Sequence, residues 1–285
     1  MRKILVKNSN NKVKKKYPVE TGYFEDNMPY ARIGYKSQIL LNIEALSTEH
    51  TPPSGFTLKQ FEKTAEPFLD DYTVYLVGRK PNLPENYLFD KMAQDYAEMI
   101  RREFDGPVDV AGTSTGGQLA QYLAANHPDT VQKLIIVSAA YRLSEKGIEI
   151  ERKSGEYFHQ KKYGKSMAAM LEMVYPSGIK RAFLKLVIKL FGKFLFRDIK
   201  YPNDFLVEVK ADREMNFKNR LLEIKAPTLL LSGELDIGYT ADDVRITAEG
   251  IPNSKLKLYE GYGHNLIMAN RKHVLEDILE FLHSS

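Results

Sequence analysis

Short apolar runs alternate with helical patterns along much of this chain, and this alternation restricts the fold more than any other feature. The runs 38–43, 73–77, 107–111 and 134–137 are separated by segments whose apolar residues recur with the spacing of one helix face. Strands that are apolar along nearly their whole length are typical of a parallel sheet covered by helices on both faces. The sequence therefore predicts an α/β fold with a doubly wound, mostly parallel sheet.

The alternation stops between about 143 and 222, where no apolar run has the pattern of a strand. It resumes with a strand at 228–231, a helix from 241, a strand at 255–259 and a closing helix at 272–283. A helical segment of this size is larger than an ordinary loop. We therefore predict a basic N-terminal tail over 1–27, a core formed by 28–142 and 223–285, and a helical cap inserted over 143–222.

Composition narrows the classes of protein to which the chain could belong. With 41 basic and 37 acidic residues the net charge is +4, which is too small to indicate a nucleic-acid partner. The absence of cysteine excludes disulfides, thiolate nucleophiles and cysteine metal sites, and it fits a reducing cytoplasm. There is no apolar stretch long enough for a secretory signal or a transmembrane helix. No histidine or carboxylate cluster has ligand spacing, so we expect no metal and no organic cofactor, and the oligomeric state stays open.

The motif Gly112-Thr113-Ser114-Thr115-Gly116 stands between a predicted strand and a predicted helix. A nucleophile on such a sharp turn projects above the sheet, and glycine two residues to either side removes side chains that would collide. The pattern predicts Ser114 as the nucleophile and the N–H of Thr115 as an oxyanion donor. The alternative is a glycine-rich helix start that binds phosphate, but no lysine follows and the spacing fits neither phosphate fingerprint.

A serine hydroxyl needs a base, and His264 is the candidate that its position favours. It lies in the glycine-rich segment 261–265, between a strand and the last helix, whereas His50 remains a minor candidate for the lining of a pocket. Asp236 follows the strand at 228–231, at the sheet edge where α/β proteins keep their sites, and is predicted to orient the base, with Glu234 as the alternative.

The motifs around Ser114, Asp236 and His264 follow one another in this order along the chain. They resemble the three triad motifs of the α/β-hydrolase superfamily. The resemblance runs from about residue 28 to residue 281, with an insertion where the family has its cap. It implies the α/β-hydrolase fold and a Ser-Asp-His triad, but no substrate. Serine at the elbow argues against the haloalkane-dehalogenase and epoxide-hydrolase branches, which carry aspartate there.

One segment departs from the pattern of that family. Where its members carry His-Gly after the first central strand, this chain has Glu44-Ala45, and Leu46 is the best match for the residue that gives the second oxyanion donor. We hypothesise that Glu44 points away from the site and bonds loop amides. An alternative is that Glu44 recognises a cationic group of the substrate.

The segment 180–197 has a basic residue at every fourth position, with mostly apolar residues between them: Arg181, Lys185, Lys189, Lys193 and Arg197. One interpretation is a cap helix that covers the pocket and keeps its lysines in water. The other is a basic amphipathic helix that contacts anionic lipid or guides an amphiphilic acyl substrate.

Together these features predict a serine hydrolase with a small-molecule ester-like substrate. We expect a carboxylesterase that acts on a small or medium ester with an apolar part through a Ser114 acyl-enzyme. The alternatives are a carbon–carbon bond hydrolase or a perhydrolase with the same triad, or a hydrolase-fold binding module without activity.

Overall fold

The fold is built around one eight-stranded sheet, seen in a computed structural model that describes residues 17–175, 178–195 and 199–284. The strand order is β1-β2-β4-β3-β5-β6-β7-β8. From β4 to β8 all neighbours are parallel, whereas β1 and β2 are antiparallel. The strands are β1 (Val19–Tyr23), β2 (Pro29–Ile33), β3 (Gln38–Ile43), β4 (Tyr72–Val77), β5 (Val108–Thr113), β6 (Val131–Val137), β7 (Thr228–Gly233) and β8 (Ser254–Tyr259).

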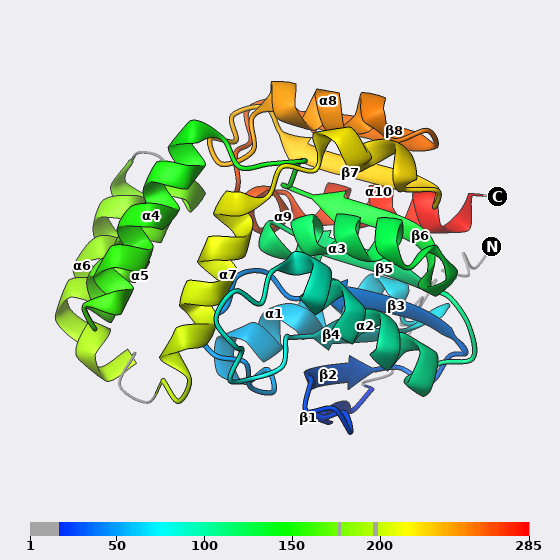
Figure 1. Ribbon diagram of the computed structural model, residues 1–285, viewed down its shortest axis with the longest axis horizontal. Coiled ribbons are helices and arrows are strands. Elements are labelled where there is room, and N and C mark those ends of the chain that lie inside the picture. Colours follow the sequence, from blue (N-terminus) through cyan, green and yellow to red (C-terminus); the bar gives the residue numbers. More distant parts are fainter. Residues whose placement is uncertain (1–16, 176–177, 196–198, 285) are drawn as a thin grey trace, which may run out of the picture.

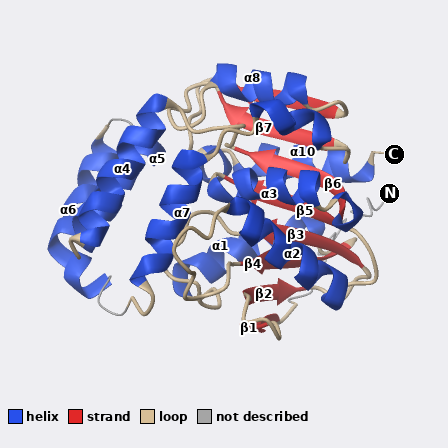
Figure 2. Cartoon of the chain, viewed as in Figure 1, coloured by secondary structure: helices blue, strands red, loops and turns tan. Residues whose placement is uncertain are grey.

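Helices cover both faces of this sheet, as Figures 1 and 2 show, so the predicted doubly wound α/β fold is confirmed. One apolar core joins the sheet to α2 (Phe89–Glu103), α3 (Thr115–Asn126) and α8 (Ala241–Gly250). A second core on the other face joins it to α1 (Gly55–Ala65), η1 (Glu66–Phe68), α9 (Leu266–Ala269) and α10 (Arg271–His283). A 3-10 turn, η2 (Pro128–Thr130), links α3 to β6.

The N-terminal part of the sheet corrects the predicted boundary of the tail. Residues 1–16 lie outside the described residues, but β1 falls within the segment 1–27 that was predicted as a tail. Five residues of β1 pair with five of β2. β1 lies at the sheet edge and buries little side-chain surface, so its apolar pattern is too weak to indicate a strand.

Four longer helices and one 3-10 helix stand between β6 and β7, where the strand pattern of the sequence stops. They are α4 (Glu145–His159), α5 (Tyr163–Val174), α6 (Ile179–Leu195), α7 (Pro202–Glu214) and η3 (Lys218–Glu223). In Figure 1, α4, α5 and α6 stand together at one side of the molecule, and α7 lies between them and the sheet. The insertion meets the core through α7 and through η3, which packs against α3 and α8.

Candidate active site

The turn between β5 and α3 has the geometry that its glycines predict. Ser114 adopts φ 55° and ψ −128°, a strained conformation for a residue with a side chain. A Cβ atom on Gly112 would lie 2.3 Å from the carbonyl oxygen of Gly116, and one on Gly116 would lie 2.4 Å from the carbonyl oxygen of Ile43. Backbone therefore fills the space beside both glycines. Ser114 stands at the start of α3, where the first N–H groups have no partner within the helix.

The structure brings the predicted nucleophile, base and acid into one hydrogen-bonded line. Nε2 of His264 lies 3.1 Å from Oγ of Ser114, and Nδ1 of His264 lies 2.9 Å from Oδ2 of Asp236. When Nδ1 carries the proton it donates to the carboxylate, and Nε2 is free to accept the hydroxyl proton of Ser114. The exposed side chain of Glu234 makes no such contact, so Asp236 is the residue that meets the base.

The second oxygen of Asp236 is held by the loop that follows it. Backbone N–H groups of Gly238 and Tyr239 donate to Oδ1 at 2.8 and 3.1 Å. The ring of Tyr239 stacks on the imidazole of His264, with centroids 5.7 Å apart and planes 24° apart. The sequence reading did not single out Tyr239, whose position within three residues of Asp236 is the one local signal for it.

The imidazole of His264 is nearly buried, and its environment favours the charged form. Burial acts to lower the pKa of His264, but the charge of Asp236, its hydrogen bond and the charge of Asp212 raise it above the ordinary value. A base with a raised pKa binds the proton taken from a nucleophile more strongly. Asp212 comes from α7, so a residue of the insertion contributes to the electrostatics of the site.

Arg79 organises the loop that should carry the second oxyanion donor. Its buried guanidinium donates to the carbonyl oxygens of Glu44 and Ala45 at 2.6 and 3.1 Å. Leu46 follows directly and packs against an apolar cluster of the insertion. Hydrogen bonds to carbonyl groups fix the path of this loop without the glycine that is usual there.

The side chain of Glu44 does not make the bond that we hypothesised. Its buried Oε2 atom accepts no hydrogen bond from a loop amide or from any other described residue. Burial raises the pKa of Glu44 to about 7, although the nearby charge of Arg79 acts in the opposite direction. A neutral Glu44 would not oppose an oxyanion, and its role in substrate recognition stays a hypothesis.

Three acidic residues of α7, spaced four apart, bind the core through buried contacts that the sequence reading missed. Asp204 accepts hydrogen bonds from the N–H groups of Asn82 and Leu83 at 2.9 and 2.7 Å. Glu208 accepts from Arg79 at 2.6 Å and also contacts His50. The third, Asp212, reaches the elbow itself.

Asp212 links the insertion directly to the start of α3. The hydroxyl of Thr115 donates to Oδ2 of Asp212 at 2.5 Å. On its other side Asp212 meets Glu151 of α4, close enough to share a hydrogen bond when one carboxyl group is protonated. Burial and the charge of its neighbour raise the pKa of Glu151 well above the ordinary value. Burial therefore favours the protonated form of a carboxyl group in this pair.

His50, the minor candidate, belongs to this buried network and not to the line of Ser114. Its Nδ1 lies 2.8 Å from the carbonyl oxygen of Lys80, and its Nε2 contacts the carboxylate of Glu208. Burial lowers the pKa of His50, but the charge of Glu208 and the hydrogen bond to it raise the pKa above the ordinary value. These contacts favour the charged form of His50 beside the acidic face of α7.

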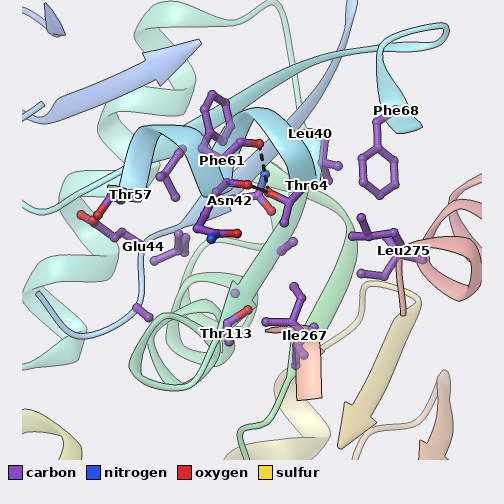
Figure 3. A pocket seen from close by; sticks show the side chains of 18 of the residues that line it. Leu40, Asn42, Glu44, Thr57, Phe61, Thr64, Phe68, Thr113, Ile267 and Leu275 are labelled. Carbon is purple, nitrogen blue, oxygen red and sulfur yellow. Dashed lines mark hydrogen bonds between the residues drawn. The ribbon is translucent and has the colours of Figure 1, made fainter. Parts of the chain in front are cut away.

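A cavity of about 330 Å³ lies against the elbow, on the side of the sheet that faces α1 and α10. Thr113 and the loop 44–46 line it at one end, as Figure 3 shows for Thr113 and Glu44. Most of its wall is apolar, with Phe61, Ile267 and Leu275 among the lining residues. It offers an apolar space beside the residue that precedes Ser114.

The comparison with family models decides the membership of the chain. Residues 86–270 match the model described as serine aminopeptidase, S33. The chain belongs to the serine aminopeptidase S33 family. The matched region contains Ser114, Asp236 and His264, and it includes the whole insertion. Members of this family are hydrolases, and the chain is an α/β-fold hydrolase.

Two relatives by sequence and one solved structure are also similar to this chain. The poly(3-hydroxyalkanoate) depolymerase of Ectopseudomonas oleovorans is 25% identical over 72% of this chain and 71% of its own length. A pimeloyl-[acyl-carrier protein] methyl ester esterase of Chromobacterium violaceum is 37% identical, but over only 29% of this chain and 32% of its own length. The crystal structure of MGS-M2, an α/β hydrolase from a Medee basin deep-sea metagenome library, has a TM-score of 0.75 at 14% identity and covers 93% of this chain and 98% of its own. The last likeness shows the fold alone.

Proposed function

We propose that the chain is a carboxylesterase that cleaves a small or medium ester with an apolar part through an acyl-enzyme on Ser114. The observation that carries this proposal is the hydrogen-bonded line from Ser114 through His264 to Asp236 at the start of α3. The names of the depolymerase and of the methyl ester esterase, both relatives by sequence, support an ester as the substrate.

In the proposed reaction, Oγ of Ser114 attacks the ester carbonyl carbon while Nε2 of His264 takes its proton. The N–H groups of Thr115 and Leu46 donate to the oxyanion of the tetrahedral intermediate. The intermediate collapses, the protonated His264 gives its proton to the departing alkoxide, and the alcohol leaves. His264 then takes a proton from a water molecule as that water attacks the acyl-enzyme. It gives the proton to Oγ of Ser114 when the acid leaves, which restores the free enzyme.

Reaction with a fluorophosphonate probe tests the activation of Ser114. Intact mass should show one adduct on the wild-type protein and none on Ser114→Ala. Ser138→Ala is the matched control, because Ser138 also follows a central strand with positive φ, yet has no histidine partner. It should label like the wild type. Failure of the wild type to label would favour a binding module without activity.

The apolar cavity offers a place for the apolar part of the ester. p-Nitrophenyl esters of increasing acyl length should show a preferred length, and Thr64→Phe, which adds a ring to the wall of the cavity, should shorten it. Lys63→Phe adds the same ring at the exposed neighbouring position of α1 and should leave the preference unchanged. Product analysis on the same substrates separates ester hydrolysis from carbon–carbon cleavage and perhydrolysis.

A second candidate, hydrolysis of an amide next to a free amino group, is favoured by the acidic pair in α4 and α7. No other described residue donates a hydrogen bond to Oε2 of Glu151 or Oδ1 of Asp212, and Asp212 contacts the residue after Ser114. In its ionised form this pair would present two acceptors to a substrate ammonium group, and the description of the matched family names an aminopeptidase. Release of 4-nitroaniline from aminoacyl anilides, but not from their N-acetyl derivatives, would support this candidate over the esterase.

A further inference from the structure

Helix α6 exposes a continuous row of apolar side chains. Ile179, Phe183, Leu186 and Leu190 follow one another at intervals of four, three and four residues, so they lie on one face of the helix. Their exposed fractions are 90, 62, 52 and 65%, and Phe191 beside them is 55% exposed. We call these five residues the apolar row. Contiguous exposed apolar surface of this kind marks an interaction site in a protein that is folded in water.

The charges of α6 indicate the chemistry of the partner. Between Ile179 and Leu195 the sequence contains no aspartate and no glutamate, but it contains five basic residues: Lys180, Arg181, Lys185, Lys189 and Lys193. A helix with an exposed apolar face and only basic residues among its charged ones complements a surface that is apolar inside and anionic outside. A bilayer with anionic phospholipid headgroups has both properties.

The position of α6 leaves this row accessible. Figure 1 shows α6 at the outer edge of the molecule, on the far side of α4 and α5 from the sheet. Its packing partner is α5, and it makes no extensive contact with the core among the described residues. A flat surface can therefore approach the row without displacing any other described helix.

We propose that α6 lies in the surface of an anionic phospholipid bilayer, with the apolar row among the acyl chains and Lys180 and Lys185 at the headgroups. None of the described helices is long and apolar enough to cross a membrane, which fits a helix that lies in the plane of the surface. At 1.5 Å per residue the helix is roughly 25 Å long. The docking does not depend on the proposed esterase activity.

Docking of α6 would also bring the membrane close to the site. Helix α5 lies between them, and its buried Met173 packs against Gly238, whose N–H binds Asp236. The lipid surface would then be one helix layer from the loop that holds Asp236. An amphiphilic ester that leaves the bilayer would have a short path to Ser114.

Vesicle flotation of the full chain tests the proposal. At salt on the order of 100 mM, the protein should float with phosphatidylcholine vesicles that contain about 30% phosphatidylglycerol, and much less with phosphatidylcholine alone. Phe183→Ser/Leu190→Ser should weaken binding to the anionic vesicles by roughly tenfold or more, because it removes apolar contact and keeps every charge.

A matched control comes from the exposed residues Phe56 and Leu222, which lie outside α6. Phe56→Ser/Leu222→Ser removes the same two side chain types, which are 72 and 66% exposed, and should bind vesicles like the wild type. Circular dichroism and probe labelling of Ser114 without vesicles show that each variant is folded, so loss of docking is distinguishable from loss of the proposed activity.

Three outcomes would overturn the proposal. The first is the absence of flotation with anionic vesicles, and the second is equal binding by the two double variants. The third is a concentration-dependent dimer in size-exclusion chromatography that Phe183→Ser/Leu190→Ser abolishes, since a second copy of the chain would then be the occupant of the apolar row.

Discussion

Replacing Gly112 with alanine tests whether the backbone packing of the elbow leaves room for a side chain. The added Cβ would lie 2.3 Å from the carbonyl oxygen and 2.5 Å from the carbonyl carbon of Gly116. These are backbone atoms at the start of α3, so no rotamer change can relieve the overlap. Either β5 or the first turn of α3 must move, and Ser114 moves with it.

The same substitution at Gly155 provides a control with the opposite sign. There a Cβ would lie 3.6 Å from Cγ1 of Val209, which is ordinary van der Waals contact. Gly155 is inside α4, where alanine is favoured over glycine by about 0.5–1 kcal/mol. Overpacking at Gly112 should cost about 1–3 kcal/mol or more. The unfolding free energies of the two variants should therefore differ by roughly 2 kcal/mol or more.

Urea denaturation followed by circular dichroism measures both values, and fluorophosphonate labelling shows the state of Ser114. We expect Gly155→Ala to label at the wild-type rate with a raised midpoint. Gly112→Ala should have a lowered midpoint and should label slowly, because the distance of 3.1 Å between Oγ of Ser114 and Nε2 of His264 cannot be kept. Wild-type stability together with wild-type labelling of Gly112→Ala would refute the steric reasoning.

Three further predictions concern buried carboxyl groups. Asp236→Asn should lower kcat by roughly 10⁴-fold with little change in stability, since the amide favours the wrong tautomer of His264; wild-type turnover on a p-nitrophenyl ester would contradict this. The pKa of Glu44 is raised to about 7 in the folded protein, so the folded state binds this proton more tightly than the unfolded state does. The free energy of unfolding should therefore fall as the pH rises from about 5 to 8. Glu44→Gln should flatten that part of the urea-derived pH profile, and an unchanged profile would reject the assignment. Glu208→Gln leaves the charge of Arg79 buried and should cost about 3–5 kcal/mol in urea unfolding, whereas the exposed Glu214→Gln on the same helix should stay within about 0.5 kcal/mol of the wild type.

The parts of the site that the sequence predicted are those encoded by short segments of chain. The motif around Ser114 fixes its own turn, and the helix predicted to follow it runs from Thr115 to Asn126. Asp236 and His264 follow strands of the same parallel sheet, so strand order alone brings their loops to one edge.

The contacts of the insertion could not be predicted in this way. Thr115 and Asp212 are 97 residues apart, and their hydrogen bond depends on how α7 packs on the core. The signal was present as three acids at intervals of four, 204, 208 and 212, on a helix whose other buried residues are apolar. An acidic face on a buried helix requires donors opposite it, and Arg79 and His50 supply them.

Helices α7 and α6 of the insertion are attached to the rest of the protein in different ways, so they differ in how readily their sequences can be replaced. Helix α7 is tied to the core by acids that cannot lose a partner without leaving a buried charge, whereas α6 is attached through apolar packing on α5. Protein engineers could therefore exchange α6 for a helix of different length or charge while α7 keeps Thr115 and Arg79 in place. The exchanged α6 would then determine which surface or substrate the protein selects, while the contacts of α7 would keep the geometry at Ser114 unchanged.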